Sequence, residues 1–218
     1  MFAYPKQTEF NRVVPKAKVY EYAKPSRAIR SRFVSQVSEI VWKCKLSPET
    51  INLPARQGIQ EIQVFVIALK TGELNGDVLR TMDKTIPSPI FYELTFEDRV
   101  KFTAAYKRPS AIGASKSVID AYYETRWQPV TVARPPLPVA LDLSGLYEQM
   151  LRCHMAIPSR PGESLDFYVE RVNRICGKQI ECRRLEARLN QEIQFNRKVE
   201  LNAALRLKKT ELAELQQP

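Results

Sequence analysis

The stretch Glu61-Ile-Gln-Val-Phe-Val-Ile-Ala-Leu69 is the most informative part of the sequence for the fold, because it is apolar and rich in β-branched residues. It is too short for a typical helix, so its composition predicts a largely buried strand. Two alternating segments, residues 90–95 and 99–106, flank Phe96-Glu-Asp98 and predict a β-hairpin. Residues 77–84 are predicted to form a short helix, and residues 117–127 a further strand.

A helix is predicted upstream of this stretch, beginning after Ser26, whose hydroxyl can accept a hydrogen bond from the first helical turn. Apolar residues then recur at helical spacing as far as Cys44, before Leu46-Ser-Pro48 ends the pattern. They are Ile29, Phe33, Val37, Ile40, Val41 and Cys44. The order of the elements indicates an α+β head domain over residues 1–127, with a small mixed or antiparallel sheet and helices on one face.

Residues 128–142 are predicted to form an extended connector, because four prolines each fix the backbone and remove a hydrogen-bond donor. A helical arm is predicted over residues 143–218. It comprises a short amphipathic helix at 143–155 and a long helix at 164–216, where good helix formers dominate and no proline occurs. If continuous, the long helix would extend about 75 Å at ~1.5 Å per residue.

The apolar residues of the long helix do not keep one heptad frame, which argues against a long, regular, coiled-coil dimer. Leu185, Leu189 and Ile193 recur every four residues, whereas Leu201, Leu205 and Leu212 keep a seven-residue register. We expect either a hairpin folded near Gly177 or an arm whose faces meet different partners. The residues predicted to bind a partner are Leu185, Leu189, Ile193, Leu201, Leu205 and Leu212.

The composition is that of a folded protein with an unusual charge. Hydrophobic residues make up 44 % of the chain, and the formal net charge is +10, which favours polyanionic partners. The first residues lack the pattern of a secretory signal, and the longest apolar run, residues 64–69, is far shorter than the ~18 residues of a membrane span. The four cysteines form no CxxC pair. We therefore expect a cytoplasmic protein with reduced thiols and no membrane partner.

The positive charge is concentrated in residues 1–45 and 171–209. The first segment is predicted to contact the phosphates of a nucleic acid, since its cations alternate with Tyr20 and Tyr22. The predicted nucleic-acid-binding residues are Lys16, Lys18, Lys24, Arg27, Arg30 and Arg32. A solvated basic surface is the alternative. In the second segment, acidic and basic residues alternate in a way that supports a helix, so protein docking is the expected role.

No catalytic motif is complete. Gly113-Ala-Ser-Lys-Ser117 resembles the end of a phosphate-binding loop but lacks the first glycine, so a loop between strands is the preferred interpretation. Cys153 and His154 are adjacent and point about 100° apart on a helix, which disfavours a nucleophile and its base. The sequence predicts no metal site and no cofactor.

A metal-dependent nuclease remains an alternative. Glu61, Glu93, Asp120 and Lys107 lie on or beside the predicted strands, and two carboxylates with a lysine could hold Mg²⁺ if they converged. The acid-x-lysine spacing typical of such enzymes is missing. Charged residues at strand edges also commonly face water.

Several stretches resemble a bacterial family of domains of unknown function, the one numbered 4391. They are Lys24-Pro-Ser-Arg-Ala-Ile-Arg30 through Val41-Trp-Lys43, Leu46-Ser-Pro-Glu-Thr-Ile-Asn-Leu-Pro54, Pro138-Val-Ala-Leu-Asp-Leu-Ser-Gly-Leu-Tyr-Glu-Gln-Met150 and Gln194-Phe-Asn-Arg-Lys-Val-Glu-Leu-Asn202. The resemblance implies an association with DNA methyltransferases and helicases in defence or mobile-element loci, and it supplies no catalytic residues.

The leading hypothesis is therefore a non-catalytic accessory subunit of a bacterial DNA-modification or anti-phage defence complex, with a methyltransferase or helicase as its partner. In this hypothesis the arm docks on the partner while the basic N-terminal segment touches DNA phosphates. The alternatives are the nuclease and a homodimeric structural protein that binds no DNA.

Overall fold

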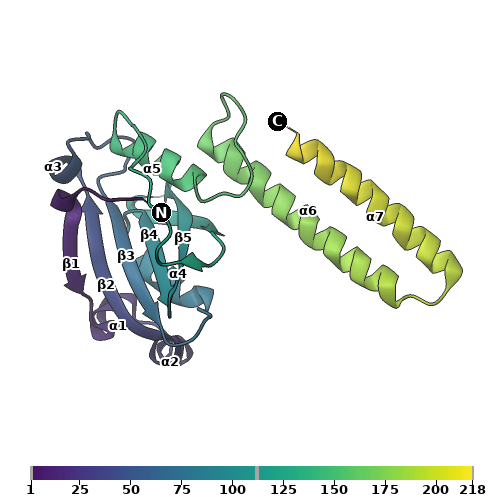
Figure 1. Cartoon of the computed structure of the whole chain (residues 1–218), viewed down its shortest axis with the longest axis horizontal. Helices are drawn as coiled ribbons and strands as arrows, with labels where there is room; N and C mark the ends of the chain where they lie inside the picture. Colours follow the sequence, from purple (N-terminus) through teal and green to yellow (C-terminus); the bar gives the residue numbers. More distant parts are fainter. Residues whose placement is uncertain (1, 111–112, 218) are drawn as a thin grey trace. The chain divides into compact units, whose positions relative to one another are not determined.

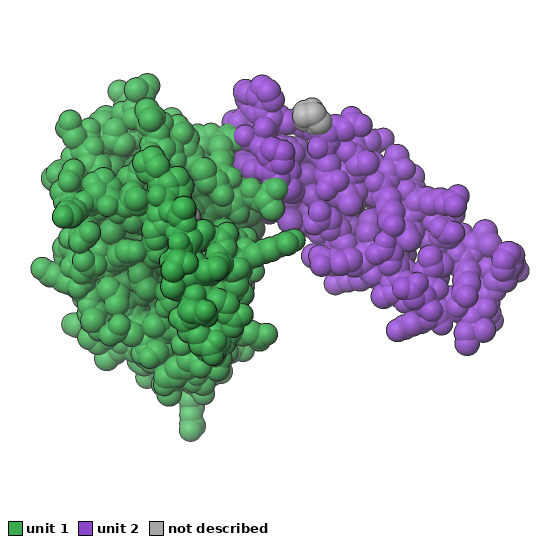
Figure 2. Space-filling model, in the orientation of Figure 1, with its two compact units in different colours: residues 1–156 green, residues 157–218 purple. Residues whose placement is uncertain are grey.

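The computed structural model describes residues 2–110 and 113–217, apart from the side chains of residues 108–110, 113–118 and 120. The chain forms two compact units, residues 1–156 and 157–218 (Figures 1 and 2). The first is built on a mixed β-sheet and the second on two long helices, which confirms the predicted α+β class.

The sheet of the first unit has the strand order β1-β2-β3-β4-β5-β6, and β7 pairs with β5. Among the paired strands of the described residues, β3 and β4 are parallel and the other pairs are antiparallel. The strands are β1 (Glu9–Val13), β2 (Val37–Leu46), β3 (Ile62–Leu69), β4 (Ile90–Phe96), β5 (Arg99–Ser110), β6 (Gly113–Glu124) and β7 (Gln128–Pro129). The predicted strand at 61–69 and the predicted hairpin are therefore confirmed, and the edge strand β1 was not predicted.

Three helices cover one face of this sheet: α1 (Lys16–Ala23), α2 (Arg27–Gln36) and α4 (Gly76–Thr85). Each helix buries at least one side chain against Phe65 and Tyr92 of the central strands. These side chains include Val19, Phe33 and Met82. Alternate residues of a strand point to opposite faces, so the intervening positions of β3 and β4 face the other way. Short turns, η1 (Lys6–Thr8) and α3 (Pro48–Ile51), complete the N-terminal half.

The opposite face of the sheet is covered by α5 (Leu143–Arg152), which belongs to the first unit. The Tyr147 hydroxyl accepts a hydrogen bond from the Lys107 amide at 2.8 Å and lies 3.2 Å from the Ala105 carbonyl. Its ring meets Phe91 edge-on. This helix was predicted as part of the arm, but its buried side chains pack on the sheet, because an amphipathic helix this short is stable only against another apolar surface.

The predicted helix after Ser26 is wrong beyond Gln36. Ser26 caps α2 as expected, its hydroxyl accepting from the Ile29 amide, but residues 37–46 form β2. Register shifts at Val37/Glu39 and Trp42/Cys44 interrupt the two-residue alternation of this strand. Its buried positions Val37, Ile40 and Cys44 consequently recur every three or four residues and imitate a helix.

The second unit is a helical hairpin of α6 (Leu165–Gln191) and α7 (Phe195–Gln216) (Figure 1). The single long helix predicted at 164–216 is thus two helices. The chain turns at residues 192–194, while Gly177 lies inside α6 with no atom near the position a side chain would take. The Glu192 carboxylate accepts hydrogen bonds from the Ile193 and Gln194 amides and so satisfies backbone donors of the turn before α7.

Within the described part of the chain, no helix combines the length and the apolar character that a membrane crossing requires.

Candidate functional site

The predicted nucleic-acid-binding residues all lie on α1, on α2 or in the turn that joins them. Four of the six have partners within the first unit. These are Lys16 with the Val37 carbonyl, Lys18 with Glu21, Arg30 with the Pro25 carbonyl and the Tyr20 ring, and Arg32 with Asp77. Lys24 and Arg27 are exposed and make no side-chain hydrogen bond or ion pair with the residues that the structure describes. Only part of the predicted cluster is therefore free to meet a ligand.

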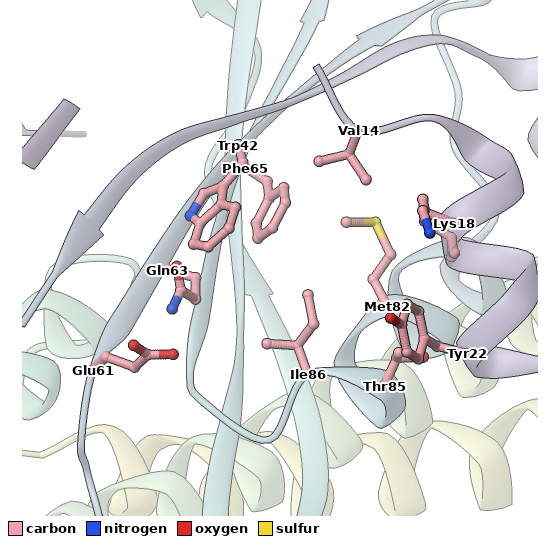
Figure 3. Close-up of a pocket in the computed structure, with 11 residues that line it drawn as sticks. Val14, Lys18, Tyr22, Trp42, Glu61, Gln63, Phe65, Met82, Thr85 and Ile86 are labelled. Atoms are coloured by element: carbon pink, nitrogen blue, oxygen red, sulfur yellow. The ribbon is translucent and has the colours of Figure 1, made fainter. Parts of the chain in front are cut away.

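A pocket of about 330 Å³ opens beside α1, between this helix, α4 and the sheet (Figure 3). Its apolar wall includes Trp42 and Phe65, whose rings lie 14° from parallel with centroids 6.0 Å apart. In this view Phe65 lies between Trp42 and Met82, and Ile86 lies below Phe65. Sequence patterns did not predict this pocket, because its walls come from segments that only the fold brings together.

The polar residues of the pocket lie at two separate ends. Glu61 and Gln63 lie on one side in Figure 3, and Lys18 and Tyr22 on the other. The Gln63 amide oxygen is buried and has no hydrogen-bond partner among the described residues. Such an atom costs free energy unless a ligand or a water molecule satisfies it.

The residues of the nuclease alternative do not converge. Glu61 pairs with Lys45 at 2.8 Å and accepts from the Ser88 hydroxyl. Tyr92 packs on the face of the sheet that α4 covers, and adjacent strand residues point to opposite faces, so Glu93 points to the face that α5 covers. The Lys107 side chain pairs with Asp83 of α4, so it lies on the face opposite to Glu93. The Asp120 side chain lies outside the described residues.

Glu93 holds the proline-rich connector against the sheet. Arg134 donates to both of its carboxylate oxygens, at 2.9 and 3.1 Å, and Lys43 donates to them from β2 at 3.1 and 2.9 Å. The Ala3 amide also donates to the Pro135 carbonyl at 2.7 Å. These contacts give the buried carboxylate two cationic partners and a structural role.

Lys107 and Asp83 form a buried ion pair, with Lys107 Nζ 2.9 Å from Asp83 Oδ1. The same ammonium donates to the carbonyls of Asp83, Ile86 and Ser88, where α4 ends. Burial lowers the pKa of Lys107 and raises the pKa of Asp83, since both charged forms are removed from water. The Tyr122 hydroxyl donates to the other Asp83 oxygen at 2.5 Å. This cluster fixes α4 on the sheet.

The adjacent residues Cys153 and His154, considered above as a nucleophile and its base, differ in burial. His154 is buried and its Nδ1 lies 2.7 Å from the Met150 carbonyl, whereas Cys153 is exposed. Residues 113–117, the partial phosphate-binding motif, begin strand β6 instead of forming a loop, and their side chains lie outside the described residues. Among the side chains that the structure does describe, no three of the His, Cys, Asp and Glu residues gather as metal ligands would.

The hairpin uses most of the residues predicted to bind a partner for its own packing. Ion pairs between the helices join Lys178 to Glu211, and Lys208 to Glu181 at 3.3 Å. This register places Leu185 at the level of Leu205, and Leu189 at that of Leu201. Of the five predicted leucines, Leu205 is buried and the others, Leu185, Leu189, Leu201 and Leu212, are half-buried.

The turn end of the hairpin is different, because its apolar side chains face water. Ile193 is 90 % exposed, Phe195 77 % and Val199 54 %. Three cations lie near this end and form no ion pair with the described residues: Arg188, Arg197 and Lys198. We call these six residues the hairpin end. Among these apolar residues the sequence analysis named only Ile193, because it expected any hairpin to fold near Gly177 and not at residues 192–194.

Comparison with known proteins yields one match. The family model described as Domain of unknown function (DUF4391) matches residues 2–212 and so extends over both units. Neither the curated proteins nor the solved structures contain a match to the chain.

Proposed function

This chain belongs to the DUF4391 family, and we propose that it is a non-catalytic accessory subunit of a larger assembly that acts on DNA. The hairpin end docks on the partner, a DNA methyltransferase or helicase of a modification or defence system. The exposed cations of α1 and α2 contact nucleic-acid phosphates. A partner of this kind places the protein in the cytoplasm.

The observation that carries this proposal is the exposed apolar surface of the hairpin end. Ile193, Phe195 and Val199 lie within seven residues of one another, on the turn and the first part of α7. Burying such a side chain fully contributes about 1.5–3 kcal/mol. A small group of apolar and aromatic residues of this kind supplies most of the binding energy in many interfaces.

The charge of the hairpin end indicates the partner's chemistry. Its three cations have Glu186, Glu192 and Glu200 as their acidic neighbours along the chain; Glu186 pairs with Lys209, and Glu192 accepts hydrogen bonds from the turn amides of Ile193 and Gln194. An apolar cleft with an acidic rim would complement this surface, and the charges would speed the encounter. The proposal asks no catalysis of this chain, since Glu61, Glu93 and Lys107 lie apart.

Copurification from the native locus tests the docking. The tagged protein is expressed with its genomic neighbours, and bound proteins are quantified by mass spectrometry. The double variant Ile193→Ser, Phe195→Ser is expected to lose a DNA methyltransferase or helicase that the unaltered chain retains. Leu207→Ser is the matched control, since Leu207 is 61 % exposed on α7 but lies away from the turn.

Two results would contradict the proposal. In the first, the double variant retains every partner. In the second, light scattering shows that the isolated protein is a dimer which the double variant converts to a monomer; the hairpin end would then join two copies of the chain, as in the homodimer alternative.

A further inference from the structure

We infer that the pocket beside α1 receives an unpaired base of a single-stranded nucleic acid, while cations of α1, the α1–α2 turn and the start of α2 contact the backbone. The inference rests on the phosphate contact of the proposed function and is independent of the hairpin end. It concerns residues of the first unit alone.

The walls of the pocket suit a flat, aromatic ligand. Trp42 and Phe65 stack on one another and form the aromatic part of the wall, and the Met82 thioether and Ile86 also line the pocket (Figure 3). Stacking on aromatic side chains is how many proteins hold bases of single strands, at about 1–3 kcal/mol per base. A sulfur atom also makes favourable contacts with aromatic rings. A cavity of about 330 Å³ is within the range of small-ligand sites.

One end of the pocket offers hydrogen-bond acceptors. Glu61 contributes a carboxylate, and Gln63 an amide oxygen that nothing in the described part of the chain satisfies. The ion pair with Lys45 offsets the negative charge of Glu61 and so reduces its repulsion of phosphates. Carboxylate and amide groups accept hydrogen bonds from the amino groups of cytosine and adenine, whereas thymine has no amino group. The pocket therefore favours an amino-bearing base.

The other end of the pocket faces the positive charge of the unit. Lys18 lines the pocket, and Lys24 follows in the turn after α1, with no partner of its own in the described chain. Arg27, at the start of α2, is also exposed and makes no side-chain hydrogen bond or ion pair with the described residues. Glu21 offsets one of these charges through its pair with Lys18. The remaining cations can neutralise phosphates on either side of a bound base.

This arrangement selects single strands. In a duplex each base is stacked and paired, and taking it out costs a few kcal/mol. The pocket lies between helices and a sheet, so a base must leave its stack to enter. Unpaired DNA and unpaired RNA share the required chemistry, and the binding assay below separates them.

Fluorescence anisotropy with short labelled oligonucleotides tests the inference on the full chain. We expect a single-stranded oligonucleotide of adenine and cytosine to bind at least about five-fold more tightly than the same backbone without bases, the lower limit of one stacked base. A thymine-only strand is expected to bind between the two, and a duplex more weakly than the single strand. DNA and RNA versions are compared directly, and tighter binding of either identifies the source.

A pocket-filling variant locates the base. Val14→Phe places a ring in the pocket, and Val13→Phe is its control, since Val13 is the exposed neighbour outside the pocket. Val14→Phe is expected to reduce binding of the base-bearing strand to the level of the abasic strand, and Val13→Phe to leave it unchanged. A second variant, Gln63→Met, keeps the volume and removes the acceptor, so it should reduce the preference for adenine and cytosine over thymine.

The possible failures are distinguishable. Equal binding of abasic and base-bearing strands overturns the base pocket and leaves the phosphate contact standing. Binding by Val14→Phe equal to that of the unaltered chain also overturns the pocket. Absence of binding to every oligonucleotide, at low salt as well, overturns the pocket and the phosphate contact of the proposed function together.

Discussion

His154, the single histidine of the chain, should make the stability of the first unit fall in mildly acidic solution. The ring is 5 % exposed and lies against Phe91 and Phe2, with ring centroids 5.2 and 6.4 Å away. Burial lowers its pKa from 6.5 to about 4, although the hydrogen bond to the Met150 carbonyl acts in the opposite direction. The folded protein therefore holds this histidine neutral at pH values where the unfolded chain protonates it.

The sign and size of the effect follow from this difference in pKa. Because the folded pKa is the lower one, stability is complete above the unfolded value of 6.5 and is lost as pH falls towards 4. The full difference corresponds to about 3 kcal/mol at 1.36 kcal/mol per pKa unit. At pH 5 roughly 2 kcal/mol of it is already lost relative to pH 8.

Urea unfolding followed by tryptophan fluorescence measures this loss. Trp42 and Trp127 both belong to the first unit and are the two tryptophans of the chain, so the signal excludes the hairpin. His154→Phe keeps an aromatic ring and cannot titrate, and His154→Gln keeps a donor for the Met150 carbonyl. Both variants should lose about 2 kcal/mol less than the unaltered chain between pH 8 and pH 5. Carboxylates that titrate in all three proteins cancel in the comparison.

Equal losses in the three proteins would refute the reasoning, since they would show that His154 is not kept neutral by burial. A larger loss in either variant would do so as well.

Three further predictions concern other contacts. Lys107→Met leaves the Asp83 carboxylate buried without its cation and should cost about 3–5 kcal/mol, measured as the urea stability of the first unit. In the hairpin, Leu205→Ala should cost about 2–5 kcal/mol, because this side chain is buried, whereas Leu207→Ala at an exposed position should cost under ~0.5 kcal/mol; hydrogen exchange of α6 and α7 separates the two. Arginine hydrogen bonds lower the pKa of Glu163 to about 2, so the stability that this group contributes is present above its usual value of 4.5 and is lost as pH falls from there. Glu163→Gln should remove that part of the acid sensitivity, as hydrogen exchange of the hairpin between pH 5 and pH 3 would show.

The central strands could be predicted because their signal is local. Residues 62–69 and 90–106 carry β-branched and alternating patterns that no distant contact needs to explain. The helix predicted through Cys44 failed for a tertiary reason. Pairing of β2 with β3 includes two irregularities of register, and these give Val37, Ile40 and Cys44 the spacing of a helix face.

The same contrast between local sequence signals and tertiary contacts applies to the candidate sites. The basic character of residues 16–32 could be read directly, but the partners of Lys16 and Arg32 lie 21 and 45 positions further along the chain. Nothing in the local sequence shows that these two charges are already engaged. The pocket is lined by Val14, Trp42 and Met82, which are similarly far apart in the sequence, so no local motif could predict it.

Composition and short-range order were enough to predict the helix and strand content of most segments and the excess of positive charge, and to show that no catalytic motif is complete. Tertiary structure alone decided that α5 covers the sheet, that the C-terminal helix folds back at residues 192–194, and which cations and apolar side chains remain exposed. The physical reason is that burial is a property of surfaces assembled from distant segments, and a side chain's chemistry is available only where that assembly leaves it in contact with water.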